Sequence, residues 1–558
     1  MTRLRLLLAA LVLALATTTV AQHAMPPKYE VRAVWLTTIK GLDWPHAYTP
    51  HQQKAELCHI LDQLQAANIN TILLQTRVRG TTIYPSAYEP FDVALTGANA
   101  QTMGYDPLQY AIEQCHKRGM EIHAWMVTLP IGQASLRGYK HLRNTVPHLI
   151  KRIGEDWYLN PEQPATATYL ATLASEIVEH YDVDGIHLDY IRYPETWRNA
   201  SSSTPQQRRN NTTAIVRAIH HAVKKRKPWV KVSCSPVGKY ADLPRYSSGG
   251  WNARNAVAQD AQQWLAEGIM DQLYPMMYFR NNQFFPFALD WQENAARRTV
   301  VPGLGIYFMH PSEGRWTLHD ITRQLVFLRQ EHMGFAFFRS KFFTDNTKGL
   351  YHYVAHRHTP YPALTPPMTW QQSTPPAPPT NVRLKPVLQT NTTCLAWQPA
   401  HANDDNVRYN IYASPTLPVD INDVRHLIAI RVAATTLTLP ENTQRTPLHY
   451  AVTTIDRYGN ESLPTPCTNT ATNVGNAIPL ITTDGKTLPL PKAALTNNRQ
   501  RLIIADITGK SLHQVDITHE VKALNIRALP EGVYQLYTRT PDNRRKCVAL
   551  FTVRRIKR

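Results

Sequence analysis

The residue of this chain that is best placed for chemistry is Asp189, in the stretch YDVDGIHLDYIRYP at residues 181–194. A turn signal, a short strand of alternating apolar residues and then the carboxylate follow one another in this stretch. The ends of the strands of a β/α barrel converge on one mouth, so a carboxylate at such an end is positioned for chemistry. Taken by itself, the stretch is equally compatible with an Asp189 that only caps the following loop.

The elements that would position Asp189 alternate between strand and helix patterns from Tyr29 to about Arg357. The strand-like runs are EVRAVWLTTI, NTILLQTR, MEIHAWMV, the stretch ending at Asp189, WVKVSCSP, DQLYPMMYF, TVVPGLGIYF and MGFAFFRS. Each is followed by a helical pattern, which predicts an α/β fold with a (β/α)8 TIM barrel over residues 29–358. Long connections follow four of these strands, at 78–105, 128–163, 190–205 and 237–257, and predict a substrate groove on the mouth side.

Other carboxylates on the predicted mouth side could act together with Asp189. Glu313 follows the seventh strand in HPSEGRW, and Asp43 follows the first in GLDWP. We favour these two equally as the second acid, while Asp242 and Asp345, which also follow strands, stay open as alternatives.

Four further titratable residues are predicted to be structural. Asp184 and Asp271 begin strands, which places them at the bottom of a barrel, opposite the mouth. His123 and His187 alternate with apolar residues inside strands, where core histidines are more common than ligands. His187 shares a strand side with Asp189 and could orient it.

The composition describes a basic, multi-domain protein. The 558 residues include 60 Lys and Arg against 41 Asp and Glu, a formal charge of +19 that favours anionic partners. The chain has no basic run long enough for a nucleic-acid arm, and we expect no nucleic-acid partner. Six cysteines lie far apart without a metal-binding spacing, so we predict no metal and no cofactor.

The two ends of the chain carry further signals. Residues 1–21 combine Arg3 and Arg5 with an apolar run and a small-residue site, and predict a secretory signal peptide. We therefore expect an exported protein without an integral membrane segment, in the periplasm, at the outer-membrane surface or outside the cell. Residues 359–379 include eight prolines and predict a semi-rigid linker.

The C-terminal third is predicted to be β-rich. Residues 380–470 carry short strand-like runs with Trp397, Tyr409 and Tyr450, and resemble a fibronectin type III module, a small β-sandwich. Residues 475–558 end in LPEGVYQLYTRTPDNRRKCVALFTVRR and resemble the sorting domains of the type IX secretion pathway. A plain accessory β-domain is the alternative for this last segment.

The barrel segment resembles a known family in pieces spread over most of residues 30–340. These pieces are EVRAVWLTTIKGLDWP, QTRVRGTTIYPSAYEPF, GYDPL, RGMEIHAW, YLNPEQP, YDVDGIHLDYIRYP and WLAEGIMDQLYPMMYF. They are similar to the DUF187-like, YddW/DigH-type barrels related to glycoside hydrolase family 10. The resemblance implies a glycosidase of cell-wall glycans, most directly of peptidoglycan strands without their stem peptides.

Glycosidic cleavage requires two carboxyl groups, one to protonate the leaving oxygen and one to attack the sugar or activate water. Asp189 is the first choice, with Glu313 and Asp43 as the candidates for its partner. The strand that ends at Asp189 also resembles the corresponding strand of chitinase-type barrels. Those barrels have an acid two residues after the aspartate, and Ile191 stands at that position here. The chain also departs from the pattern of the family it resembles at Val127-Thr128 and at residues 78–81, which bears on the substrate rather than the fold.

Aromatic and basic side chains near strand ends are predicted to bind the glycan. Aromatic faces suit the CH-rich faces of sugars, and guanidinium groups at the mouth, including Arg79, would attract a carboxylate such as the lactyl group of muramic acid. The predicted binding residues are Arg77, Trp44, Trp125, Tyr190, Arg192, Tyr193, Trp251, Tyr278 and Arg339. Two alternatives remain: a non-catalytic glycan-binding barrel, and a glycosidase of another polysaccharide. Bond specificity, stereochemical outcome and oligomeric state do not follow from the sequence.

Overall fold

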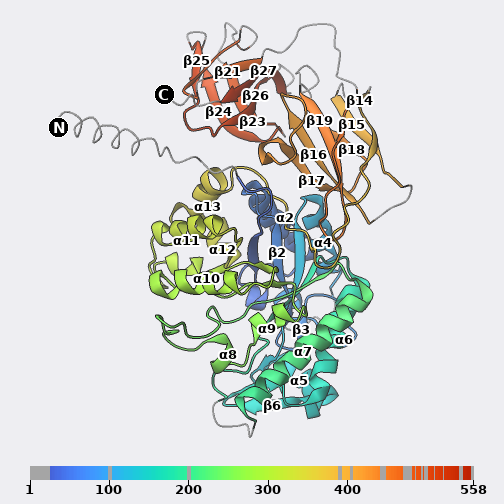
Figure 1. Ribbon diagram of the computed structural model, residues 1–558, viewed down its shortest axis with the longest axis vertical. Coiled ribbons are helices and arrows are strands. Elements are labelled where there is room, and N and C mark those ends of the chain that lie inside the picture. Colours follow the sequence, from blue (N-terminus) through green and yellow to red (C-terminus); the bar gives the residue numbers. More distant parts are fainter. Residues whose placement is uncertain are drawn as a thin grey trace, which may run out of the picture.

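The computed structural model describes residues 26–97, 103–197, 203–387, 392–401, 406–439, 448–468, 480–483, 485–491, 494, 500–507, 509–518, 521–539 and 545–553. A mixed α/β part occupies one end of the molecule and antiparallel sheets occupy the other (Figure 1). The predicted signal peptide lies outside the described residues. Within them, no helix combines the length and the apolar character needed to cross a membrane.

The α/β part is built on one sheet whose principal strands run parallel. These strands are β1 (Arg32–Leu36), β2 (Thr71–Val78), β4 (Glu121–Val127), β8 (Gly185–Asp189), β9 (Lys231–Cys234), β10 (Gln272–Leu273), β11 (Thr299–Val300), β12 (Gly303–Leu304) and β13 (Phe335–Phe337). The sheet follows a barrel-like course, because β1 pairs with β2 on one side and with β13 on the other. The predicted parallel, barrel-like arrangement of strands and helices is confirmed, and each predicted strand overlaps an observed one.

The sixth and seventh predicted strands are shorter than expected. Pro275 closely follows β10, and Pro302 separates β11 from β12. Proline has no N–H to donate to a neighbouring strand, so the regular ladder stops there. Single parallel bridges continue the course of the sheet, from Met276 to Val237 and to Gly303.

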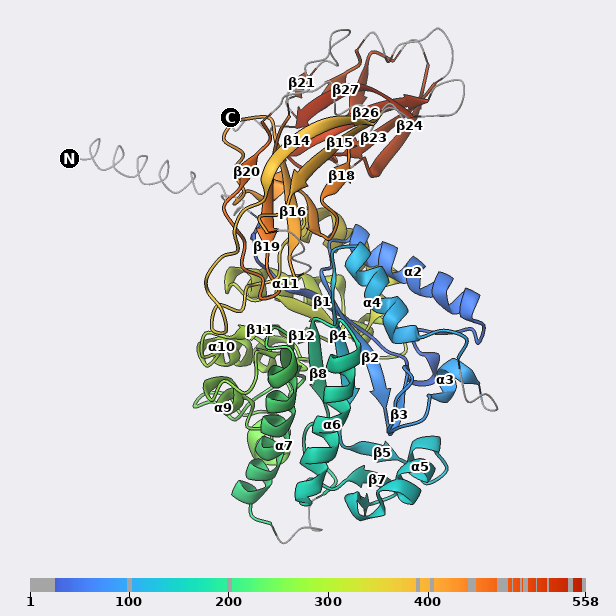
Figure 2. The same ribbon diagram turned by 90° about the vertical axis from the view of Figure 1, so that its right-hand side faces the viewer.

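Helices cover the outside of the sheet (Figure 2). They are α2 (Pro50–Ala66), α4 (Pro107–Lys117), α6 (Pro164–His180), α7 (Pro205–Arg226), α9 (Ala261–Ala266), α10 (Phe285–Glu293), α11 (Leu318–Gln330) and α13 (Leu350–Tyr353). Capping side chains fix the starts of three of them, since Thr49, Asp106 and Thr204 accept backbone N–H groups ahead of a proline. The main core lies between helices and sheet, and a smaller core around Trp35 and Trp125 fills the inside.

The loops that follow the strands on the mouth side contain elements of their own. These are η1 (Ile39–Gly41), β3 (Thr81–Thr82), α3 (Val93–Thr96), β5 (Pro130–Gly132), α5 (Arg137–Thr145), β6 (Ile150–Ile153), β7 (Asp156–Leu159), α8 (Ala253–Ala256), η4 (Ile306–Met309) and α12 (Ser340–Thr344). Strands β5, β7 and β6 form a separate three-stranded sheet. It lies beyond the end of β2, on the side away from the C-terminal sheets (Figure 2).

The region after the proline-rich segment begins with two antiparallel sheets. Their strands are β14 (Thr380–Val387), β15 (Thr392–Gln398), β16 (Arg408–Ser414), β17 (Leu427–Val432), β18 (Thr436–Thr438), β19 (His449–Ile455) and β20 (Thr465–Pro466). The orders β14-β15-β18 and β17-β16-β19-β20 enclose a core in which the rings of Trp397 and Tyr409 lie 5.3 Å apart. This agrees with a β-sandwich, while the fibronectin type III resemblance remains a prediction.

A third set of strands, antiparallel except for the parallel pair of β21 with β27, ends the described chain. It contains β21 (Leu480–Thr483), β22 (Thr487–Pro489), β23 (Gln500–Asp506), β24 (Ser511–Ile517), β25 (Ala523–Asn525), β26 (Gly532–Arg539) and β27 (Arg545–Val553). Five of these strands form the sheet β21-β27-β26-β23-β24. The last segment is therefore β-rich as predicted, and its role in sorting stays a prediction.

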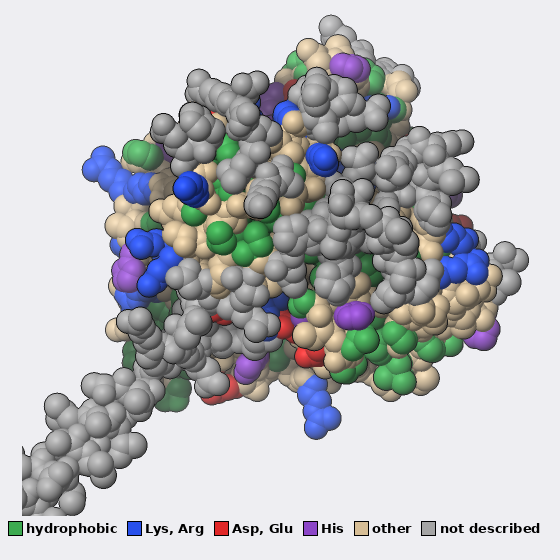
Figure 3. Space-filling view, turned by 90° about the horizontal axis from the view of Figure 1, so that it is seen from above, with side chains coloured by type: hydrophobic (Ala, Val, Ile, Leu, Met, Phe, Trp, Pro, Cys, Tyr) green, Lys and Arg blue, Asp and Glu red, His purple; other side chains and the backbone are tan. Residues whose placement is uncertain are grey.

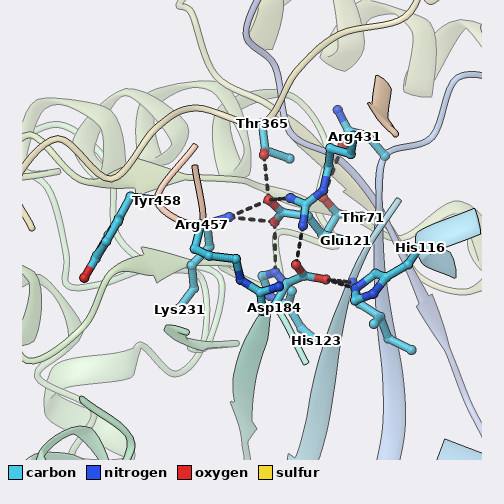
Figure 4. Close-up of polar contacts among 12 residues, drawn as sticks. Thr71, His116, Glu121, His123, Asp184, Lys231, Thr365, Arg431, Arg457 and Tyr458 are labelled. Carbon is cyan, nitrogen blue, oxygen red and sulfur yellow. Dashed lines mark hydrogen bonds and ion pairs between the residues drawn. The ribbon is translucent and has the colours of Figure 1, made fainter. Parts of the chain in front are cut away.

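The β-sandwich is bound directly to the bottom of the barrel-like sheet (Figure 4). Arg431 of β17 donates to Glu121 Oε1 over 2.9 Å and also to an oxygen of Asp184, both at strand starts. Lys231 Nζ lies 2.6 Å from Glu121 Oε1, and His116 Nε2 lies 2.9 Å from Asp184 Oδ2. The structural role predicted for Asp184 follows from this network, which we call the base lock.

The proline-rich segment is packed against the same surface and does not separate the two parts. Thr365 Oγ1 donates to Glu121 Oε1 over 2.7 Å, and Trp370 Nε1 donates to Asp271 Oδ1 over 2.9 Å. Asp271 is fully buried at the bottom of the sheet, as predicted for a structural residue.

On the face seen from the C-terminal sheets, the described Lys and Arg side chains lie at several separate places (Figure 3).

Candidate active site

Asp189 ends β8 at the mouth, where its neighbours in the sheet bind the carboxylate. Trp125 Nε1 of β4 donates to Oδ2 over 3.1 Å, and Ser235 Oγ, just past β9, donates to Oδ1 over 2.9 Å. The backbone N–H of Tyr190 also donates to Oδ1 over 2.8 Å. The side chain is 5% exposed and has a fixed orientation. Asp189 therefore does more than cap the following loop.

The environment of Asp189 favours its protonated form. Burial raises the pKa of its carboxyl group, and the charge of Arg192 together with the hydrogen bonds opposes the rise only in part. The group keeps its proton to a higher pH than an ordinary aspartic acid. A carboxyl group with a raised pKa at the mouth of a barrel is suited to giving a proton to a bound molecule.

Trp125 has a different role from the one predicted. Its ring is buried, so it offers no platform to a sugar, and its indole N–H orients Asp189 instead. Ser235 was not among the predicted site residues, although it lies inside the fifth predicted strand and directly after the observed β9. Its contact depends on β8 and β9 being neighbours in register, with Leu188 opposite Cys234.

Arg192, Tyr190 and Trp251 form a basic and aromatic rim beside Asp189. The Arg192 guanidinium carbon lies 4.5 Å from the centre of the Tyr190 ring and 5.4 Å from that of Trp251. Arg192 is buried, and its Nε has no hydrogen-bond partner among the described residues. Tyr190 and Trp251 are 41% and 44% exposed. This rim can take both an anionic group and the face of a sugar ring.

Three aromatic rings that follow β10, β12 and β13 pack together. Tyr278 stacks on Phe338, with ring centres 5.5 Å apart, and meets the edge of Tyr307 at 5.8 Å. Burial and then the negative charge of Asp189 raise the pKa of Tyr278. Burial and then Glu313 raise the pKa of Tyr307 to about 12. Glu313 is exposed in the loop after η4, and its role as the second carboxyl group stays a prediction.

The carboxylate of Asp43 is hydrogen-bonded to the loops around it. It accepts hydrogen bonds from Thr37 N (2.9 Å) and Thr37 Oγ1 (2.7 Å), from Arg339 Nη1 and from Lys341 N (3.2 Å). Arg339 also donates to the carbonyl of Leu42 over 2.9 Å. These contacts join the loops after β1 and β13. We therefore leave Asp43 and Arg339 out of the proposed reacting groups.

Arg77 cannot reach a bound carboxylate in this structure. It is fully buried, and its Nε and Nη2 donate to Glu89 over 2.8 and 2.6 Å. Its Nη1 donates to the carbonyls of Val127 and Thr128. The guanidinium joins β2 to the end of β4, and we withdraw the binding role assigned from the sequence.

Two predicted aromatic residues are also enclosed. Trp44 has no exposed surface, and its Nε1 donates to the carbonyl of Gln53 over 2.8 Å. Tyr193 lies 5.1 Å from the ring of Trp197 and accepts a hydrogen bond from Asn211 Nδ2 over 2.9 Å. Neither ring faces the mouth, so we withdraw both from the predicted binding set.

His187 lies one layer below the carboxylate. It accepts from Trp35 Nε1 over 3.2 Å and contacts Ser233 Oγ over 3.0 Å. Burial, followed by the charge of His123, holds its pKa well below the usual value. It is the core histidine predicted from the strand pattern, and none of its hydrogen bonds is to Asp189.

A parallel, barrel-like sheet with a buried carboxyl group and an aromatic, basic rim at its mouth is the arrangement of a glycoside-hydrolase-like protein. Residues 30–308 match the family Glycosyl hydrolase-like 10, and the chain belongs to that family. The predicted resemblance to the DigH-type barrels is therefore confirmed at the level of the family.

Two curated relatives are glycosyl hydrolases by name. YngK of Bacillus subtilis is 28% identical over 386 residues, which cover 63% of this chain and 76% of that protein. DigH of Escherichia coli is 30% identical over 289 residues, which cover 45% of this chain and 65% of that protein, less than two thirds of its length. Among solved structures, the PgaB (BpsB) glycoside hydrolase domain of Bordetella bronchiseptica aligns with 58% of this chain and 98% of its own at 14% identity and a TM-score of 0.41.

Proposed function

We propose that this protein is an exported glycosidase that cleaves a cell-wall glycan, peptidoglycan strands without stem peptides being the favoured substrate. The observation that carries the proposal is the buried Asp189 carboxyl group with its raised pKa, next to the rim of Arg192, Tyr190 and Trp251. The family and both named relatives support glycoside hydrolysis. Export rests on the N-terminal signal, which lies outside the described residues.

The proposed chemistry uses two carboxyl groups. Protonated Asp189 gives its proton to the glycosidic oxygen as the bond from that oxygen to the anomeric carbon breaks. Glu313 supplies the second carboxylate, which either bonds to the anomeric carbon or accepts a proton from the attacking water. The first route retains and the second inverts the configuration. Trp125 and Ser235 orient the acid.

The rim fits an acidic sugar. Each muramic acid residue without a peptide exposes a lactyl carboxylate, and the guanidinium of Arg192, whose Nη2 lies 3.9 Å from Glu195 Oε2, can bind such a group. The faces of Tyr190 and Trp251 would contact the sugar ring. Of the arginines predicted to bind a carboxylate, Arg77 and Arg339 are engaged within the protein, which leaves Arg192 nearest to Asp189.

Digestion of purified peptidoglycan tests this function. The protein is incubated with glycan strands from which an amidase has removed the peptides, with intact peptidoglycan and with chitin, and new reducing ends are measured. We expect release from the peptide-free strands above all. Release of reducing ends from neutral chitin alone would show that the substrate is not the acidic glycan. Binding without release would favour a non-catalytic glycan-binding barrel. The observation that supports this alternative is Ile191, which stands where a chitinase-type barrel has its acid.

Replacement of Arg192 by Gln should raise KM for the acidic glycan about 10- to 100-fold, because a hydrogen bond to a charged group is lost. The matched comparison is the same glycan with its lactyl carboxyl groups reduced to alcohols, for which the KM of the two proteins should agree within about twofold. An equal rise in KM for both glycans would show that Arg192 does not recognise the carboxylate.

Ser235→Ala should raise the pKa of Asp189. The variant loses a hydrogen bond that favours the carboxylate, so the limb of the pH–rate profile that belongs to Asp189 should move to higher pH by about one unit. Ser233→Ala is the control, because that hydroxyl lies two residues earlier and contacts His187. The limb should stay in place in the control, and equal shifts in both variants would exclude a specific contact.

A further inference from the structure

A cavity lies on the mouth side of the barrel, beside the ends of β1 and β2. Its volume of about 420 Å³ is within the range of about 300–1,000 Å³ that is usual for ligand sites. Its walls come from η1, the end of β2, α3 and the start of α5. We call it the rim cavity, and none of the roles proposed above uses it.

The walls of the rim cavity are rigid where α5 meets the turn after β2. A Cβ added to Gly138 of α5 would come 2.0 Å from the carbonyl oxygen of Arg79, so the two backbones are in direct contact. The side chain of Arg79 lies against Gly132 of β5, where an added Cβ would come 3.2 Å from its Cδ. The cavity is therefore shaped by packed backbone.

Arg79 connects the rim cavity with the site around Asp189. It is exposed, lines the cavity, and its positive charge opposes the rise in pKa that burial causes in Tyr190. Strand β4 is the only neighbour between β2 and β8 in the sheet. Two strand spacings correspond to roughly 10 Å, so the cavity lies within reach of a chain whose central sugar contacts Asp189.

The charges and surfaces of the rim cavity suit an acidic sugar. Lys40 and Arg79 line it, and neither has an ion-pair partner among the residues that the structure describes. The one carboxylate in the lining, Asp92, accepts from Thr81 Oγ1 and from the N–H of Ala94, which engages both oxygens. Tyr48, 64% exposed, adds an aromatic face.

We propose that the rim cavity binds a second acidic sugar of the same glycan strand, with its carboxylate at Arg79 and Lys40 and its ring on Tyr48. This inference rests on the proposed function and makes it more specific. The protein would contact two carboxylates of one strand, one at Arg192 and one in the rim cavity. Long, repeatedly acidic strands would then be better substrates than short ones.

The test compares two lengths of peptide-free glycan, a tetrasaccharide and an octasaccharide, as substrates for turnover and as ligands in calorimetry. Arg79→Gln and Lys40→Gln are measured beside Lys225→Gln, which removes the same charge from the exposed end of α7 at the bottom of the barrel. We expect both cavity variants to lower kcat/KM and affinity for the octasaccharide about tenfold, with less than a twofold change for the tetrasaccharide. The control should match the unchanged protein at both lengths.

The outcomes separate the cavity from the function itself. Equal losses at both lengths would place Arg79 and Lys40 at the central site, and no loss at either length would show that the cavity is unused. Both results overturn the rim-cavity proposal while leaving glycan cleavage intact. If the unchanged protein neither cleaves nor binds either oligosaccharide, the proposed function fails first and the cavity proposal fails with it. Equal melting temperatures exclude misfolding as the cause of a loss.

Discussion

Asp189→Asn is expected to reduce the release of reducing ends from peptide-free glycan by about 10²–10⁴-fold, the usual contribution of a general acid or base. The amide keeps the size of the carboxyl group but cannot give a proton to the leaving oxygen. The single oxygen of asparagine can accept either from Trp125 or from Ser235 and the N–H of Tyr190, because these donors bind different oxygens of Asp189 and the amide NH2 replaces one of them. The measurement is the rate of product formation at saturating glycan, with binding followed separately.

The pKa of Asp189 predicts how this variant behaves in the absence of glycan. A carboxyl group whose pKa is raised by folding stabilises the folded state below its unfolded pKa, and this contribution disappears as the pH rises through the folded value. Above the folded pKa the ionised Asp189 therefore opposes folding, so removing its charge favours the folded state there, and the melting temperature of Asp189→Asn is measured on both sides of that pKa. Asp62→Asn, at an exposed acid of α2, is the control and should retain activity. A variant at Asp189 that keeps more than about a tenth of the activity would rule out an essential acid.

Arg431→Met should destabilise the protein by about 3–5 kcal/mol, the usual effect of removing one partner from a buried ion pair. The change leaves Glu121 and Asp184 buried with one cation fewer between them. Methionine retains the length of the side chain, so loss of packing is small. Chemical denaturation followed by tryptophan fluorescence gives the free energy of unfolding, and we expect the β-sandwich to separate from the barrel before the barrel unfolds.

Arg425→Met is the matched control, because Arg425 pairs with Asp423 on the same β-sandwich at a more exposed position and does not contact the barrel. It should cost no more than about 1 kcal/mol. Burial alone would raise the pKa of Glu121, but Lys231 and then Arg431 hold it below the usual range, and Asp184 is likewise lowered. These groups stabilise the folded state above their unfolded pKa, and the contribution declines as the pH falls through the folded values. Equal effects of the two substitutions would contradict a base lock.

The strand pattern was sufficient to predict the barrel-like sheet and the position of Asp189 at a strand end, because both depend on short-range signals. Alternation of apolar residues locates each strand, and parallel strands deliver their ends to one mouth. The strands broken by Pro275 and Pro302 were predicted too long, since the runs of apolar residues continue past the point where hydrogen bonding stops.

The roles of individual side chains depended on partners that are distant in sequence. Arg77 and Arg192 both follow strand patterns, but the pairing of Arg77 with Glu89 decides that only Arg192 is left for a ligand. Ser235 gains its contact because β9 is the neighbour of β8. No local signal shows either fact, and the same holds for Arg431, whose partners lie more than 200 positions earlier.

The base lock also fixes the orientation of the barrel mouth relative to the C-terminal sheets. The sandwich and the last sheet are attached at the bottom of the barrel, so the mouth opens on the opposite side (Figure 2). If the C-terminal sheets were attached to a surface, Asp189 would lie at the end of the molecule farthest from it, and the mouth would face away from that surface. A glycan layer on the side that the mouth faces would then contact the mouth without any reorientation of the barrel.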